Sequence, residues 1–189
     1  MTSRPHSETV TFVILLRGVM PSGKNRVPME ALRVALTHAG LVDVRTYIQS
    51  GNVIADSRMV QADVEELVHG VILENFGGDL TVVARTAVQF RRILDRNPFP
   101  VSDAPRLYFT VLVSKPSPKS LTTFRTADWE PDDVRLIDDV VYTRYATKHS
   151  DSKFNNNFFE RRLNVAATTR NFNTMTKLAE LSSRSSVEA

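Results

Sequence analysis

Hydrophobic residues in the first part of the chain change from the period of a strand to that of a helix and back. Residues 9–16 carry β-branched and apolar side chains on both alternating faces, which predicts a central strand covered on both sides. Apolar positions then recur at helical spacing between Pro28, which suits a helix start, and Gly40, which suits a helix end. Polar and apolar residues alternate over 44–49, and a tight turn leads into a short return strand.

The pattern continues with a second helix and another strand. Apolar residues at helical spacing predict a helix over 60–76, and residues 80–85 predict a strand. The resulting order, β-α-β-β-α-β, is that of the ferredoxin-like split β-α-β unit. Thr86 is a good N-cap for a further helix to about residue 95, and the Pro-rich segment 97–100 ends it.

After this segment the chain runs through the same order of elements again. Strand 106–113 is apolar on both faces, and the turn Asp138-Asp139 joins two later strands. The predicted elements are a strand at 106–113, a helix at 116–126, strands at 134–137 and 140–145, a helix capped by Ser152, a short strand at 165–167 and a last helix at 173–181.

Element order therefore predicts an α+β fold, namely a duplication of two ferredoxin-like (βαββαβ) halves packed together, with extra helices. The halves share no strong sequence identity, so the repeat lies in the order of their elements. The predicted domains are a disordered tail at 1–8, a first ferredoxin-like half at 9–96, a second half with the C-terminal helix at 97–182, and a flexible tail at 183–189.

Composition narrows the class of protein. The chain has 189 residues, of which 42% are hydrophobic, so it can form a packed core. It has no cysteine, which excludes disulfides, a thiolate nucleophile and Cys-ligated metals, and suits a reducing compartment. The N-terminus lacks the pattern of a signal peptide, and the longest apolar run, Phe12–Leu16, is too short to cross a membrane. These features predict a cytoplasmic protein that does not associate with membranes.

Charge is distributed unevenly, although the net charge is only +3. Residues 17–27 contain three cations and no acid, and residues 144–177 contain seven cations against two acids. Between them, residues 56–79 contain six acids against Arg58 alone. These stretches are either ordinary solvated faces or, if the two basic stretches meet in space, an anion site.

The segment Gly18–Asn25 matches the phosphate-loop pattern G-x-x-x-x-G-K up to its last position. Asn25 stands where a Ser or Thr hydroxyl would hold Mg²⁺, and Pro28 would disturb the first turns of the following helix. We therefore expect no Mg²⁺-dependent nucleotide hydrolysis at this loop. A looser anion cradle made by the glycines and Lys24 remains an alternative.

The segment Thr168–Thr174 enters the last predicted helix and is polar throughout, except for one aromatic residue. Free N–H groups at a helix start suit an anion, and Arg170 would add a fork of donors. The alternative is plain capping, in which Thr169 or Asn173 satisfies the first turn and Arg170 extends along the surface.

Other candidate chemistry is weaker. Four histidines lack the spacing of a metal site, so we expect no metal and no cofactor.

His149, Ser150 and Asp151 are the residue types of a hydrolytic triad, but neighbours on one loop align poorly as a relay, so a helix-capping turn is favoured. Aromatic residues on the central strands of the second half are typical of an RNA-binding sheet, but a sheet covered on both faces cannot stack bases.

Six motifs span nearly the whole chain. They are LLRGV at Leu15–Val19, GKNRVPM at Gly23–Met29, VRTYIQSGNV at Val44–Val53, NPFP at Asn97–Pro100, SKFNN at Ser152–Asn156 and ATTRNFNT at Ala167–Thr174. With these motifs the chain resembles the bacterial domain-of-unknown-function family 1697. The resemblance implies a fold of two ferredoxin-like halves, and it implies no activity, because the family has none assigned.

The chain departs from the usual family pattern in two loops and at one aromatic position. Met20-Pro21-Ser22 stands where Asn-Val-Gly is usual, residues 148–151 replace a Gly-rich turn, and Phe172 stands where Trp is frequent. Losing glycines stiffens both loops and weakens the case for a backbone anion cradle.

Polar groups on several separate loops predict one ligand site, because folding alone gives no reason for their convergence. The predicted ligand-binding residues are Arg17, Lys24, Asn25, Gln49, Ser50, Asn52, Lys153, Arg170 and Asn171. The predicted partner is an anionic small molecule, phosphorylated or otherwise, or nucleic acid, bound in a basic cleft between the two halves. An enzyme of undetermined class using the same cleft, or a protein-interaction module, stays open as an alternative, as does the oligomeric state. The opposing interpretation is that each polar group only caps its own turn.

Overall fold

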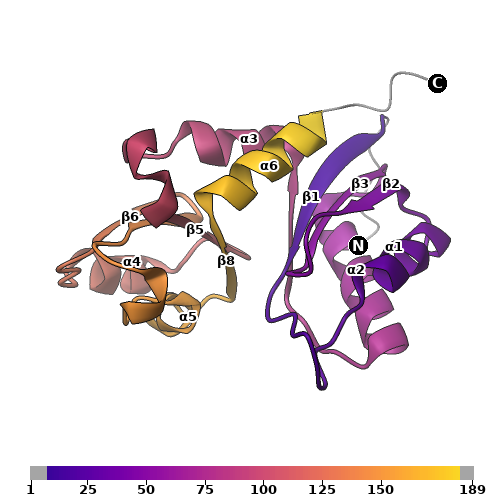
Figure 1. Ribbon diagram of the computed structural model, residues 1–189, viewed down its shortest axis with the longest axis horizontal. Coiled ribbons are helices and arrows are strands. Elements are labelled where there is room, and N and C mark those ends of the chain that lie inside the picture. The colour runs from indigo at the N-terminus through magenta and orange to yellow at the C-terminus, as the bar shows by residue number, and fades with distance from the viewer. Residues whose placement is uncertain (1–7, 184–189) are drawn as a thin grey trace. The chain divides into compact units, whose positions relative to one another are not determined.

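The computed structural model describes residues 8–183 and divides into two compact units (Figure 1). Unit 1 contains the chain up to Arg92 and again from Lys177 on, and unit 2 contains Ile93–Thr176. The division was expected at 96–97, with the last helix wholly in the second half. Of the predicted tails, 1–8 and 183–189, all but Glu8 and Ser183 lie outside the described residues.

Unit 1 contains a four-stranded antiparallel sheet in the order β2-β3-β1-β4. Its elements are β1 (Val10–Leu16), α1 (Met29–His38), β2 (Val42–Thr46), β3 (Asn52–Ser57), α2 (Gln61–Phe76) and β4 (Val82–Thr86), with α3 (Ala87–Asp95) following β4 and passing into unit 2. Residues Phe12–Leu16 of β1 are at most 1% exposed, as the doubly apolar run predicts. Alternate β1 residues, such as Phe12 and Ile14, join a core with residues of α1 and α2, so these helices cover one face of the sheet.

Local sequence explains the ends of these elements. Gly77 ends α2 in the left-handed conformation, with φ of 69°, which glycine adopts without strain. The Thr86 hydroxyl accepts the Gln89 N–H at 3.2 Å, and the Gln89 side chain accepts the Thr86 N–H at 2.8 Å. This reciprocal pair is a capping box, and it confirms Thr86 as the predicted cap of α3.

Unit 2 contains a second four-stranded antiparallel sheet, in the order β6-β7-β5-β8. Its elements are a 3₁₀ helix (Val101–Arg106), β5 (Leu107–Leu112), α4 (Pro118–Arg125), β6 (Asp133–Ile137), β7 (Val140–Arg144), a short 3₁₀ helix (His149–Asp151), α5 (Asn156–Leu163), β8 (Ala167–Asn171) and α6 (Phe172–Ser183), which continues into unit 1. Together the two sheets with their helices confirm an α+β fold.

The core of unit 2 is rich in aromatic side chains. Phe124 of α4 and Phe159 of α5 are buried, and Trp129, in the connection after α4, packs against both at centroid distances of 4.6 and 6.1 Å. Phe154 closes the same cluster at 5.1 Å from Trp129. This cluster fixes the connections around it, because aromatic side chains bury large areas in specific geometries.

Two expectations about unit 2 are wrong. The last strand is not confined to 165–167 but runs to Asn171, so most of the segment expected to lead into a helix start is strand. The helix α5 begins three residues later than a Ser152 cap would place it, and Asn155 caps it by accepting the Phe158 N–H at 3.1 Å. The Ser152 hydroxyl is used elsewhere, since it donates to Asp132 at 2.6 Å.

Within residues 8–183, no helix is long and apolar enough to span a membrane.

Candidate functional site

Three connections meet at one end of the sheet of unit 1. The Leu16 N–H donates to the Gly51 carbonyl at 2.8 Å, and the Gln49 side-chain amide donates to the Val27 carbonyl at 2.9 Å. The Arg17 N–H donates to the Thr81 carbonyl at 3.0 Å. The loop after β1, the turn before β3 and the connection before β4 therefore lie side by side.

Gly51 shows how tightly the turn is seated on the loop. Its φ is 76°, and a Cβ atom added there would lie 2.7 Å from Leu16 Cβ and 2.7 Å from Val19 Cγ2. Both distances are shorter than real Cβ contacts, so only glycine allows this approach. The turn thereby fixes the position at which the loop after β1 begins.

The loop itself, residues 17–28, is held by a few backbone contacts. The Met20 N–H donates to the Asn25 carbonyl at 2.9 Å, and the Arg26 N–H donates to the Gly23 carbonyl at 3.1 Å. Gly23 has φ of 78°, where glycine is favoured. These contacts fold residues 20–26 into a compact loop tip.

The loop tip presents positive charge and free hydrogen-bond donors to solvent. Lys24 and Arg26 are exposed, and within residues 8–183 neither side chain has a hydrogen bond or ion pair. In the same described range, the N–H groups of Ser22, Gly23 and Lys24 donate no hydrogen bond. Arg17 lies half-buried at the base of the loop. Lys24, Arg26 and the N–H groups of residues 22–24 are thus cations and donors without a partner in residues 8–183.

Among the predicted turn residues, Gln49 and Ser50 are exposed beside this loop, whereas Asn52 is fully buried. The Asn52 side-chain amide donates to the Tyr47 carbonyl and to the Ser50 hydroxyl, each at 3.0 Å. Asn52 therefore holds the turn together and does not face a ligand. Asn25 is half-buried within the loop.

Lys153, in unit 2, lies in surroundings that do not favour an anion. It lines a pocket of about 230 Å³ together with Glu130, Asp132 and Asp151. Its ammonium lies 4.9 Å from the centroid of the Phe154 ring, in cation–π geometry. Three carboxylates against one ammonium make this pocket net negative.

The Arg170 side chain is hydrogen-bonded to other residues of its own strand, β8. Its guanidinium donates to the Thr168 hydroxyl and to the Thr169 carbonyl, each at 2.8 Å. Burial lowers the pKa of Arg170 to about 10, so the group is still protonated at neutral pH. Arg85 on β4 makes the matching bond, donating to the Ala84 carbonyl at 2.7 Å.

Asn171 caps α6, since its side-chain oxygen accepts the Thr174 N–H at 2.9 Å. The capping alternative therefore describes this segment, although the cap is Asn171 and not Thr169 or Asn173. The Thr169 hydroxyl instead lies 2.8 Å from the Thr110 hydroxyl and donates to Asn156 at 2.9 Å.

The His149–Asp151 segment forms no catalytic relay. The His149 ring stacks on Tyr108 at a centroid distance of 4.6 Å, and its buried Nε2 has no hydrogen-bond partner. Burial lowers the pKa of His149. Two tyrosines of this region, Tyr142 and Tyr145, are buried, so they offer no stacking platform for bases.

Two features escaped the sequence analysis. His69 Nε2 lies 2.9 Å from Asp79 Oδ1, and Gly78, the residue before Asp79, lies next to the Lys24 carbonyl of the loop after β1. Trp129 borders a pocket of about 260 Å³ in unit 2. Neither follows from spacing, because His69 and Asp79 lie on separate elements and the pocket depends on tertiary packing. Within residues 8–183 there is no group of three histidine or acidic side chains placed to hold a metal.

Comparison with known proteins shows a family without an assigned function. No curated protein matches the chain. The structure of the conserved bacterial protein SP0830 from Streptococcus pneumoniae is similar, with a TM-score of 0.74 at 20% identity over 94% of this chain and 100% of that one, which shows a shared fold. The family profile described as "Protein of unknown function (DUF1697)" matches residues 10–142, and the chain therefore belongs to the DUF1697 family.

Proposed function

We propose that this protein binds a phosphorylated or otherwise anionic small molecule at the loop after β1 in unit 1. The observation that carries the proposal is the pair of exposed cations, Lys24 and Arg26, which have no partner within residues 8–183. They lie on a loop whose N–H groups at 22–24 are also unbonded in that range. Clusters of free backbone N–H groups and cations are typical anion-binding concavities.

Hydrogen bonds and close contacts around the loop also support a preformed site. Gln49 is bonded to Val27, and Gly51 sits directly under the loop, so Gln49 and Ser50 lie next to it. A loop already held in place loses less conformational entropy when a ligand binds. The proposed site comprises Arg17, Lys24, Asn25, Arg26, Gln49 and Ser50.

This set differs from the predicted one. Asn52 is left out because it is buried, and Arg26 is added because it is exposed beside Lys24. Lys153, Arg170 and Asn171 are not needed, since their side chains have partners within unit 2.

A cytoplasmic location, with no cofactor, stays part of the proposal because the chain lacks cysteine and a metal-site spacing.

A thermal-shift screen against inorganic phosphate, nucleotides, sugar phosphates and short oligonucleotides tests the proposal. A ligand at about a hundred times its Kd stabilises the folded state by about 2.7 kcal/mol, which such a screen detects. The double variant Lys24→Gln/Arg26→Gln should lose the shift. Lys115→Gln is the matched control, because Lys115 is exposed on the corresponding connection of unit 2, between β5 and α4.

The outcomes separate the candidate ligands. A shift with small phosphates that the double variant abolishes supports the proposal. A shift with oligonucleotides alone, falling steeply with salt, would assign nucleic acid as the ligand instead. A shift that survives in the double variant, or no shift with any compound, would contradict the proposal.

The His69–Asp79 pair favours an enzyme as the second candidate. A histidine oriented by a carboxylate is the usual arrangement of a general base. Asp79 follows Gly78, where an added Cβ would lie 3.6 Å from the Lys24 carbonyl oxygen. If the bound compound is converted over time, His69→Gln should stop conversion while leaving binding intact, and an inert compound would argue for binding alone.

We also infer that the two units are copies of one ferredoxin-like βαββαβ element. The support is their equivalent strand order and one contact repeated at the same strand position. Arg85 and Arg170 stand next to last in β4 and β8, and each donates to the preceding carbonyl. A helix carboxylate also bonds each strand, two residues apart in register: Glu65 of α2 accepts the Ala84 N–H at 2.8 Å, and Glu160 of α5 accepts the Ala167 N–H at 2.9 Å. Superposing the two sheets should therefore align Arg85 with Arg170.

A further inference from the structure

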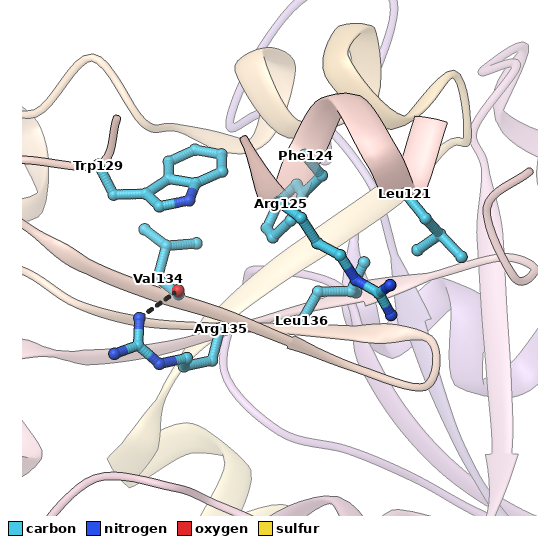
Figure 2. Close-up of a pocket in the computed structure, with 7 residues that line it drawn as sticks. All are labelled: Leu121, Phe124, Arg125, Trp129, Val134, Arg135 and Leu136. Carbon is cyan, nitrogen blue, oxygen red and sulfur yellow. Dashed lines mark hydrogen bonds between the residues drawn. The ribbon is translucent and has the colours of Figure 1, made fainter. Parts of the chain in front are cut away.

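The pocket beside Trp129 is lined by apolar side chains and by hydrogen-bond donors, with no side-chain acceptor. Four apolar residues come from α4 and β6, namely Leu121, Phe124, Val134 and Leu136. The remaining lining residues are Trp129, Arg125 and Arg135 (Figure 2). All residues of this pocket belong to unit 2, and none of them belongs to the loop after β1.

The indole of Trp129 forms a rigid wall. Phe124, Phe154, Phe158 and Phe159 surround it at centroid distances of 4.6, 5.1, 6.1 and 6.1 Å. Figure 2 shows the indole nitrogen on the edge of the ring that faces Val134. Within residues 8–183 this N–H donates no hydrogen bond. The wall is therefore preformed and carries a free donor.

The two arginines differ in their present partners. Arg135 uses one guanidinium nitrogen to donate to the Val134 carbonyl at 2.9 Å, as the dashed line in Figure 2 shows. Arg125 is exposed at the other side of the pocket, and in the described part of the chain it has no hydrogen bond and no ion pair. With no acid in the lining, both charges are available to a ligand.

Size and charge together define the ligand. A cavity of about 150 Å³ holds one benzene molecule, and this pocket measures about 260 Å³. It therefore has room for a single ring with a short side arm. Guanidinium groups pair with carboxylates through two parallel hydrogen bonds, and apolar walls select an apolar body.

We propose that this pocket binds a small organic acid whose aromatic or branched body packs against Trp129 and whose carboxylate pairs with Arg125. Room for one ring and a short arm matches a small molecule of this kind. The inference is independent of the anion site in unit 1, since the two sites share no residue.

Trp129 is the single tryptophan of the chain, so its fluorescence reports on this pocket directly. The probe is 3-phenylpropionate, with 3-phenylpropionamide as its neutral control of the same shape and acetate as the control without a ring. We expect a saturable fluorescence change with the acid, at a millimolar Kd or tighter, as suits so small a ligand. The amide should bind at least about tenfold more weakly, because it lacks the charge that pairs with arginine.

Variants identify the group that holds the carboxylate. Arg125→Gln should weaken binding of the acid at least about tenfold and leave the binding of the amide unchanged. Arg161→Gln, which removes an exposed charge of α5 outside the pocket lining, should leave both affinities unchanged. A melting temperature equal to that of the wild type confirms that each variant is folded.

Three results would overturn the proposal. The first is no saturable change with the acid at tens of millimolar. The second is equal binding of acid and amide, which would mean that charge plays no part. The third is an equal loss in Arg125→Gln and Arg161→Gln, which would show a general effect of net charge and no pairing at Arg125.

Discussion

The connection from first strand to first helix differs between the two units. In unit 2, β5 reaches α4 through residues 113–117, and the Ser117 side chain caps the helix by accepting the Ser120 N–H at 3.2 Å. In unit 1, β1 reaches α1 through residues 17–28, and no side chain caps the helix at Pro28. The short connection in unit 2 shows that residues 113–117 are enough to link the first strand to the first helix. The additional residues in unit 1 are therefore not needed for the connection itself.

The connection from third strand to second helix shows the opposite difference. It is short in unit 1, at residues 58–60, and long in unit 2, at 145–155. The long one is tied into its unit, because Asp132 accepts the Ala146 N–H at 2.8 Å and Tyr145 donates to the Phe154 carbonyl at 2.6 Å. Loop length alone thus does not mark a site.

Substitution at Gly51 should have the largest effect, because this residue seats the turn under the loop of unit 1. Gly51→Ala places a Cβ 2.7 Å from Leu16 Cβ at a φ of 76°. We expect a loss of about 2–4 kcal/mol in the free energy of unfolding, measured by urea denaturation. Gly23→Ala, which meets nothing within 4 Å, should cost only about 1 kcal/mol, the strain of a left-handed alanine. Equal losses would mean that Gly51 has no special contact.

The matched arginines of β4 and β8 should contribute alike. Arg85→Ala removes a buried donor from a carbonyl and Arg170→Ala a partly buried one, so each should destabilise the protein by about 2 kcal/mol in the same assay. Arg161→Ala, on the surface of α5, should stay within about 0.5 kcal/mol of the wild type. If Arg170→Ala changes the free energy of unfolding by less than about 1 kcal/mol, Arg170 is a surface group and is again a candidate ligand-binding residue.

Serines on the two corresponding connections should differ in importance. Ser117→Ala removes the cap of α4 and should cost about 1 kcal/mol of stability. Ser22→Ala, on the exposed loop of unit 1, removes no hydrogen bond within residues 8–183 and should cost less than about 0.5 kcal/mol. A larger cost at Ser22 would show that the long loop serves folding after all.

The smallest expected effect is a pH dependence from the long connection of unit 2. Burial lowers the pKa of His149, so the unfolded chain binds a proton more readily than the folded one. Stability should therefore fall as the pH drops below the unfolded pKa of about 6.5 and level off below the folded pKa. The loss should be less than about 1 kcal/mol because the ring is partly exposed. His149→Phe should remove this loss of stability at low pH, whereas the surface variant His38→Gln should keep it. If His149→Phe leaves the pH profile of stability unchanged, the account of His149 is wrong.

Sequence periodicity predicted most of the fold because core residues repeat at the spacing of their element. The strand expected at 9–16 is found at Val10–Leu16, and the helix expected at 60–76 is found at Gln61–Phe76. The end of β8 was missed because Thr168–Asn171 carries polar residues, which are equally typical of a helix start. There the hydrogen-bond ladder to β5 decides the conformation, and that ladder is a tertiary contact.

The candidate site was predicted only in part. Adjacent strand ends brought the loop after β1 and the turn at Gln49 together, which sheet topology alone can foresee. The sequence does not reveal that the Asn52 amide turns inward to the Tyr47 carbonyl, since an amide suits a ligand and a turn equally well. The pocket at Trp129 was missed because its walls come from α4, β6 and the segment between them, and depend on packing.

Binding of an anion by the loop of unit 1 is the central claim, and an amide-resolved NMR titration with inorganic pyrophosphate tests it most directly. We predict saturable shifts at residues 18–26 and at Gln49–Ser50, absent from the corresponding connection 113–117 and abolished by Lys24→Gln/Arg26→Gln. Saturable shifts confined to unit 2, or none at any concentration, would contradict the claim.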